Sequence, residues 1–228
     1  MTDAPEILQL KITLKGMSPA VWRRVLVPTS FTLRELHGVL QVAMGWEGYH
    51  LYLFNLRAVN YGPIELHAAS PKLTLSSLQL RKNERFSYIY DMGDYWDHEV
   101  RVEGLGPSDP KQSYPVCIGG SKPCPPEDSG GVEGYRARVD DAYSPEAWQD
   151  IDTMASFTDT IQAICDSGRL PNDDDFYELE NARDRMQARL PYLKDRFSRK
   201  EVNDLFKAGR HQELQHQNTE VVFDFGGF

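Results

Sequence analysis

The start of the chain carries the pattern that most restricts its fold, which is an apolar side chain at every second position. Across residues 8–14 apolar and polar side chains alternate, and residues 16–20 then turn the chain. A period of two places all the apolar side chains on one face of a β-strand. Residues 21–27, closed by Pro28, predict a second strand. Together these segments predict a β-hairpin.

A helix follows this hairpin. Thr32 and Glu35 have the spacing of a capping box, and apolar side chains recur on one helical face as far as Met44. Gly45 is well placed to end the helix, because glycine adopts the left-handed conformation common at helix ends. Residues 51–56 then predict a short strand.

The middle of the chain predicts a second hairpin and then a long loop. Residues 86–90 and 96–102 have strand composition and predict the two arms of the hairpin. Residues 104–131 contain six prolines and six glycines, so we expect a loop there that is too long to be a simple connection.

The last part of the chain predicts helices. One begins with the N-cap Ser144, and the next ends at Gly168. Residues 172–190 predict a third helix and residues 198–207 a fourth. The final segment, residues 221–228, predicts either an added strand or a flexible tail.

These elements predict an α+β fold, with a mainly antiparallel sheet, packed helices and a helical C-terminal third. We expect residues 1–140 to form an α+β core domain. Residues 141–190 are expected to be a helical continuation of the same domain, and residues 191–228 a C-terminal extension.

Length and charge exclude some classes of protein. The 228 residues are 40% hydrophobic and 26% charged, as in ordinary globular proteins. No apolar run reaches the roughly 20 residues that cross a bilayer, and the first residues lack the features of a secretory signal. The net charge of −9 disfavours nucleic acid and anionic membranes as partners. We expect an acidic cytoplasmic protein with a protein or small-molecule partner and no membrane partner.

The turn of the second hairpin carries two carboxylates, Asp91 and Asp94. If only two residues separate the strands, these side chains face each other, and like charges at that distance need compensation. Backbone amides of the turn are one source. Arg23 or Arg24 is another, as a structural charge partner, because an arginine binds a carboxylate through two parallel hydrogen bonds.

A bound metal ion is a third source of compensation. His98 offers a nitrogen ligand, and Glu127 or Asp128 arrives from the long loop. However, His98 shares a strand face with Trp96 and is equally well explained as a core histidine. We favour structural neutralisation of the turn over a metal or ligand site, because ion-pair networks also perturb charged groups.

The loop after the first helix is rich in residues that line binding pockets. Trp46, Tyr49 and His50 are candidates for such a pocket, although a tryptophan beside a helix end is more often a core anchor. His37 lies at helical spacing with apolar residues, which predicts core packing.

The cysteines and the usual catalytic motifs identify no reaction. Cys117 and Cys124 are separated by six residues, which is not the spacing of a zinc knuckle, and Cys165 falls in a predicted helix. We expect reduced thiols. The sequence contains no glycine-rich phosphate loop, no nucleophile elbow and no His-Glu-x-x-His motif. We therefore predict no cofactor.

Several short motifs, taken in order, resemble the plasmid pRiA4b ORF-3-like family. The similarity extends from about residue 7 to about residue 175, and the combined order is specific although each piece alone is weak. The motifs are Val21-Trp22-Arg23-Arg24, Leu33-x-x-Leu36-His37, Gly45-Trp46 with His50-Leu51 and Phe54, Tyr88-x-Tyr90-Asp91-Met92-Gly93-Asp94-x-Trp96-x-His98, Cys117-x-x-Gly120 and Pro125-Pro126-Glu127-Asp128-Ser129-Gly130-Gly131-x-x-Gly134-Tyr135.

The resemblance implies an α+β domain found in bacterial and archaeal proteins, some of them associated with plasmids and insertion elements. It implies no established activity. Members of the family often carry a cysteine where this chain has Ser129, which weakens the case for an essential cysteine-based metal centre. Residues 191–228 lie outside the resemblance.

Three functions remain open, and we favour a non-catalytic binding or adaptor module. The alternatives are a metal-dependent hydrolase or nuclease-like enzyme that uses an Asp/His/Glu cluster, and a nucleic-acid-binding protein linked to mobile elements. The candidate binding residues are Asp91, Asp94, Trp96, His98, Glu127, Asp128, Trp46, Tyr49 and His50.

Overall fold

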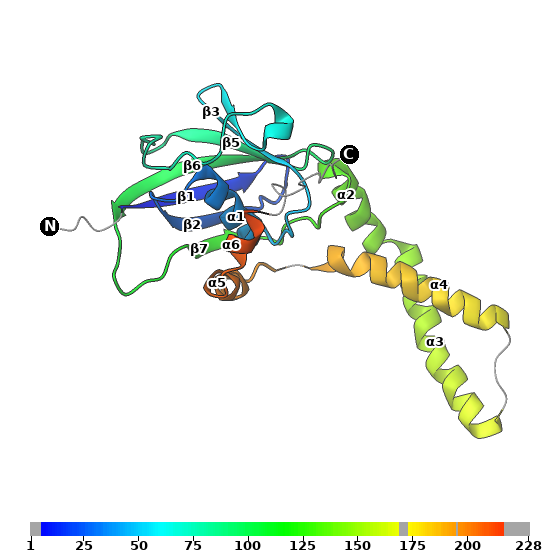
Figure 1. The fold of residues 1–228 in the computed structure, drawn as a ribbon. Coiled ribbons are helices and arrows are strands. Elements are labelled where there is room, and N and C mark those ends of the chain that lie inside the picture. The colour runs from blue at the N-terminus through cyan, green and yellow to red at the C-terminus, as the bar shows by residue number, and fades with distance from the viewer. Residues whose placement is uncertain (1–5, 169–172, 195, 217–228) are drawn as a thin grey trace, which may run out of the picture. The chain divides into compact units, whose positions relative to one another are not determined.

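A computed structural model describes residues 6–168, 173–194 and 196–216 (Figure 1). The chain divides into two compact units. One comprises the residues up to Gly131 together with those from Arg196 onward, and the other comprises Val132 to Asp195.

The first unit is built on a seven-stranded antiparallel sheet (Figure 1). The order across the sheet is β4-β3-β5-β6-β1-β2-β7. Both predicted hairpins are confirmed, since β1 pairs with β2 and β5 pairs with β6. The strands are β1 (Glu6–Leu14), β2 (Trp22–Pro28), β3 (Tyr52–Leu56), β4 (Val59–Tyr61), β5 (Arg85–Tyr90), β6 (Trp96–Pro107) and β7 (Val116–Ser121).

One face of the sheet forms the core. Leu8, Leu10, Ile12 and Leu14 of β1 are buried, while the residues between them are partly exposed, as the period of two requires. The same alternation runs along β2 and β6. The apolar face therefore needs a covering element.

Helix α1 (Leu33–Met44) supplies that cover, and ten of its residues are buried. The predicted capping box is confirmed: the Glu35 amide donates to Thr32 Oγ1, and the Thr32 amide donates to the Glu35 carboxylate. Gly45 ends the helix in the left-handed region with φ 89°. A short 3₁₀ helix (Ile64–Leu66) lies in the connection between β4 and β5.

The expectation of one long loop over residues 104–131 is wrong in its middle. Strand β6 extends to Pro107, and β7 forms the edge of the sheet beside β2. The glycines and prolines around β7 are typical of loops and gave no strand signal. The strand is held by pairing with β2 and by a side chain far along the sequence. The side-chain amide of Asn203 accepts from the Cys117 amide (2.8 Å) and donates to the Cys117 carbonyl (2.9 Å).

Asn203 belongs to a C-terminal segment that packs on the sheet unit. Helices α5 (Arg199–Lys207) and α6 (Arg210–Leu214) lie against β7 and α1. The approach of α6 is close, since a side chain at Gly38 of α1 would place its Cβ 2.1 Å from the His211 carbonyl oxygen.

The second unit contains α2 (Gly131–Ala142, except its first residue), α3 (Pro145–Ser167) and α4 (Asp173–Arg189), followed by a short 3₁₀ helix (Leu190–Leu193). Helices α3 and α4 lie side by side (Figure 1). The predicted N-cap Ser144 and C-cap Gly168 are confirmed, but they bound one helix rather than two. Helix α2 was not predicted.

The predicted α+β class, with an antiparallel sheet, packed helices and helices toward the C-terminus, is confirmed. The predicted domain boundaries stay a prediction. Residues 221–228, predicted as a strand or tail, lie outside the described residues. Within the part of the chain that the structure describes, no helix has both the length and the apolar character to cross a membrane.

Candidate functional site

The turn between β5 and β6 is wider than the sequence suggested. The last paired residues are Tyr90 and Trp96, so residues 91–95 form the connection. Asp91 has φ 59° and Tyr95 has φ 54°, a left-handed backbone that widens the reversal. Asp91 and Asp94 therefore interact with different neighbours, and the prediction that they face each other across a two-residue turn is wrong.

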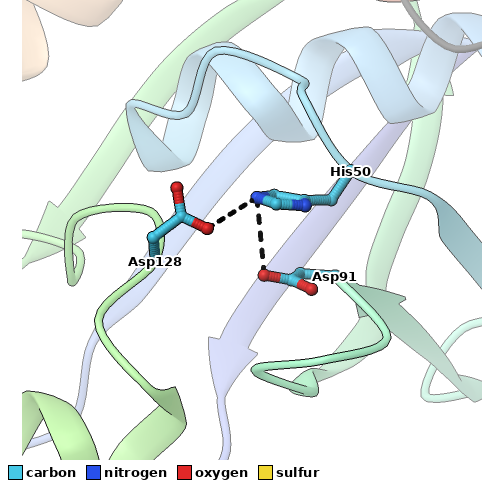
Figure 2. A group of neighbouring side chains, drawn as sticks. All are labelled: His50, Asp91 and Asp128. Atoms are coloured by element: carbon cyan, nitrogen blue, oxygen red, sulfur yellow. Dashed lines mark ion pairs between the residues drawn. The ribbon is translucent and has the colours of Figure 1, made fainter.

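Asp91 is buried and contacts the histidine of the α1–β3 loop. One of its oxygens accepts from the Gly93 amide (2.8 Å), as the prediction of backbone compensation allows. The other, Oδ2, lies 3.6 Å from His50 Nε2. The same nitrogen lies 3.1 Å from Oδ1 of Asp128, which comes from the loop after β7 (Figure 2). His50 thus stands between two carboxylates.

Asp94 has a different role, because it anchors the loop that carries Asp128. Its Oδ2 accepts from the Gly130 amide (2.9 Å). The next residue, Gly131, has φ 68° and approaches so closely that a Cβ there would lie 2.7 Å from the Asp94 carbonyl oxygen. Only glycine fits this contact without a shift of the backbone.

The other end of the same loop is held by Trp46. This buried side chain donates from Nε1 to the Pro125 carbonyl (2.9 Å). Within the loop, the buried hydroxyl of Ser129 donates to the Pro126 carbonyl (2.6 Å). Asp128 is therefore presented from a loop that is tied down on both sides.

Between these anchors, Tyr90 and Glu127 connect the loops. The Tyr90 hydroxyl donates to Glu127 Oε1 and accepts from the His50 amide (3.3 Å). Glu127 Oε2 accepts from the Glu47 amide (2.9 Å). Burial, together with Glu127, raises the pKa of Tyr90 above its ordinary value, so its hydroxyl remains a hydrogen-bond donor.

The cluster of His50, Asp91 and Asp128 has the donor atoms of a metal site. One nitrogen and two carboxylate oxygens lie within 4.8 Å of one another. Bonds from zinc to such atoms are about 2.0–2.2 Å long, so two ligands of one ion lie at most about 4.4 Å apart, and a small inward shift of these side chains brings all three to one ion. Among the described residues this is the one group of three or more potential ligand side chains that lie close enough to share an ion.

Two predicted binding residues belong to the core instead. Trp96 and His98 are both fully buried on β6. His98 Nδ1 lies 3.1 Å from the Tyr88 carbonyl, and burial lowers the pKa of His98 to about 4. The histidine that contacts Asp91 is His50 rather than His98.

The arginines predicted as charge partners of the turn have other partners. Arg23 is buried and donates to the backbone carbonyls of Ala43 (2.8 Å) and Ser121 (3.0 Å). Its guanidinium also lies 4.1 Å from the centre of the Phe197 ring. Arg24 lies on the other face of β2 and pairs with Glu103 (2.5 Å).

The remaining predicted groups divide between surface and interior. Tyr49 is 64% exposed, so it is available at the surface of the loop that carries His50. The three cysteines are free thiols. Burial raises the pKa of Cys124 to about 12 and also raises that of Cys117, so these two thiols are poor nucleophiles at neutral pH.

Sequence reasoning named Tyr90 only as part of a family motif, and it gave no role to Glu47. Tyr90 ends a strand of alternating aromatic residues, which predicts a core position and gives no signal for its hydroxyl. Glu47 contributes its backbone amide, and no side-chain pattern can reveal that.

Comparison with known proteins places these residues in a family. The model of the family described as plasmid pRiA4b ORF-3-like protein matches residues 6–163. The chain belongs to this family. The matched region includes His50, Asp91 and Asp128, as well as the loop that anchors them.

Two relatives illustrate the similarity. The uncharacterized protein y4hQ of Sinorhizobium fredii (strain NBRC 101917 / NGR234) is 39% identical over 139 residues, which cover 57% of this chain and 70% of the relative. The crystal structure of a protein of unknown function, MM3350 from Methanosarcina mazei Go1, is similar with a TM-score of 0.57 and 34% identity. That similarity covers 64% of this chain and 88% of the other. Neither description states an activity, so function must be argued from the geometry.

Proposed function

We propose that this protein is a non-catalytic binding module that holds a divalent transition-metal ion between His50, Asp91 and Asp128. One observation carries the proposal: three loops far apart in the sequence bring one imidazole nitrogen and two carboxylate oxygens within 4.8 Å of one another. Two carboxylates beside each other repel, and a cation between them removes that repulsion.

The donor set favours a first-row transition ion over magnesium or calcium. Imidazole nitrogen is a good ligand for Zn²⁺ and related ions, whereas Mg²⁺ and Ca²⁺ prefer oxygen. Asp91 is buried, but the side chain of Asp128 is 73% exposed, so an ion can enter from solvent on the Asp128 side. Three protein ligands leave coordination positions for a ligand group of a partner.

The hydrogen bonds of Glu127 favour a binding role for the site over hydrolysis. A metal-dependent hydrolase needs a general base near the metal-bound water. Glu127 is adjacent in sequence, but Tyr90 occupies one of its carboxylate oxygens and the Glu47 amide occupies the other. His98, which the sequence offered as a nitrogen ligand, is buried in the core.

A thermal-shift titration tests the metal site. We expect Zn²⁺ and Mn²⁺ to raise the melting temperature more than Mg²⁺, because an ion that binds only the folded protein stabilises it. At one hundred times the dissociation constant the gain is about 2.7 kcal/mol, or several degrees. His50→Gln, Asp91→Asn and Asp128→Asn should each abolish most of the shift.

Asp94→Asn is the matched control. It removes a carboxylate from the same turn but keeps an oxygen that accepts from the Gly130 amide, so it should retain the shift. A melting temperature that ignores all three ions would overturn the metal site. If the Zn²⁺- or Mn²⁺-loaded protein hydrolyses bis(p-nitrophenyl) phosphate, and His50→Gln removes that activity, the site stands but its non-catalytic assignment is wrong.

A further inference from the structure

We infer that the hydroxyl of Tyr90 is the positioning group of the site and sets the spacing of its three ligands without binding the metal itself. This inference rests on the proposed metal site. It concerns a residue that lies next to the ligands and contacts the chain segment of each one.

The contacts of this one oxygen connect all three ligand segments. Tyr90 immediately precedes Asp91. Its hydroxyl donates to Glu127, the residue immediately before Asp128, and accepts from the backbone amide of His50 itself. The hydroxyl thus bonds His50 directly and bonds the neighbour of Asp128, and its own residue is the neighbour of Asp91.

The ring that carries this hydroxyl is held firmly. Tyr90 is fully buried at the end of β5, and it stacks on Trp46 with ring centres 4.8 Å apart. Trp46 is in turn bonded to the Pro125 carbonyl of the Asp128 loop. Burial and this stacking restrict the ring, so its hydroxyl is a firm point for the loops that it bonds.

Such a group matters because the ligands come from loops. Metal and binding sites need ligand atoms held within about 0.5 Å of the productive geometry, and groups behind the ligands supply that precision. Removing the Tyr90 hydroxyl leaves Glu127 and the His50 amide with one partner fewer each. Both flanking loops then gain freedom that metal binding must remove again.

Tyr90→Phe tests this inference, with Tyr88→Phe as the matched control. Tyr88 lies on the same strand and is also fully buried. Its hydroxyl is bonded by His37 Nδ1 (2.8 Å) and Gln41 Nε2 (2.8 Å), which lie on α1 rather than in the ligand loops. Both variants lose a buried hydroxyl, so both should lose stability. Only Tyr90→Phe should weaken Zn²⁺ binding, by about 10–100-fold in calorimetric titration.

Amide hydrogen exchange of the metal-free protein gives a second readout. In Tyr90→Phe the amides of Glu47 and His50 should exchange faster than in the wild type, whereas in Tyr88→Phe they should not. Glu127→Gln, which keeps the side-chain shape but loses one acceptor oxygen, should give a smaller loss of affinity. It also tests the inference if Tyr90→Phe does not fold.

The outcomes separate this inference from the proposed function. If the wild type does not bind Zn²⁺ or Mn²⁺, the metal site is wrong and the role of Tyr90 falls with it. If the wild type binds and Tyr90→Phe and Glu127→Gln bind as tightly as Tyr88→Phe, the site stands and the positioning role of Tyr90 is wrong.

Discussion

The buried aspartates of the two units, Asp91 and Asp150, have different kinds of partner. In the second unit, the buried carboxylate of Asp150 accepts from Arg185 and from Arg189, and Arg189 also pairs with Asp141. In the first unit, Asp91 and Asp128 meet only a histidine and backbone groups among the contacts described above. A buried carboxylate is thus compensated by arginines in one unit and by a histidine and a backbone amide in the other.

The difference separates architecture from a potential site. Hydrogen bonds from Arg185 and Arg189 lower the pKa of Asp150, and a bond from Arg189 lowers that of Asp141. A permanent guanidinium occupies these oxygens, so they serve the fold. A histidine is a partner that a metal ion can recruit as a ligand, which leaves Asp91 and Asp128 available for a cation.

Acid should affect the two units in different pH ranges, and this is the largest effect that we expect. Burial lowers the pKa of His98 to about 4 and that of His37 to about 3, from the ordinary value of 6.5. The unfolded chain binds protons at these histidines below pH 6.5 while the folded chain does not. Each therefore costs up to about 1.4 kcal/mol of stability per pH unit between roughly pH 6 and pH 4.

The aspartates of the second unit have the opposite relation to pH. Their folded pKa values lie below the ordinary 3.8, so the stability they contribute is present above that value and is lost only as the pH falls through the lowered pKa. Tryptophan fluorescence during urea unfolding at pH 7 and pH 5 measures the effect of the two histidines. Three of the four tryptophans lie in the first unit, which also contains His37 and His98. Equal unfolding midpoints at the two pH values would contradict the histidine effect, and His67→Gln, at an exposed histidine, should leave it unchanged.

Removing an arginine from the second unit should have the next largest effect. Arg189→Ala deprives buried Asp150 of one partner and Asp141 of its guanidinium. We expect a loss of about 2 kcal/mol in the free energy of unfolding, because a buried carboxylate is left short of a donor. Urea unfolding followed by circular dichroism at 222 nm measures it. Arg183→Ala, which breaks an exposed pair with Asp184, is the control and should cost under about 0.5 kcal/mol.

The smallest effect should come from the site itself. In the metal-free protein, Asp91→Asn should change the free energy of unfolding by less than about 0.5 kcal/mol. The amide oxygen still accepts from Gly93, and the repulsion with Asp128 disappears. Asp150→Asn, which weakens two arginine contacts, should be clearly more destabilising in the same assay. Equal losses would mean that both carboxylates serve the fold alone.

Local features of the fold were predictable, whereas the partners of the charged residues were not. The period-two strands, the capping box at Thr32 and the caps at Ser144 and Gly168 depend on neighbours within a few residues. The turn after Tyr90 was misjudged because a left-handed aspartate leaves no mark in the sequence. Strand β7 was missed because its pairing comes from β2 and from Asn203.

The candidate site shows the same division. Residues Asp91, Asp128 and His50 were each predicted as candidates. However, the sequence grouped Asp91 with Asp94, His98 and either Glu127 or Asp128, and it left His50 with the aromatic loop. His50 and Asp128 lie 78 positions apart in the sequence. Only the packing of their loops at the sheet brings His50 Nε2 to 3.1 Å from Asp128 Oδ1. The Tyr90 hydroxyl and the Glu47 amide act through contacts of the same kind.

By itself, the sequence determined the α+β class, the two hairpins, the first helix and the pool of acidic, aromatic and histidine residues from which a site can form. These follow from side-chain periodicity and caps, which act over a few residues. Only the tertiary structure decided that Asp94 anchors a loop, that His98 belongs to the core and that His50 meets Asp91 and Asp128. Hydrogen bonds and ion pairs form between groups within about 3–4 Å, and that proximity is set by how distant segments pack.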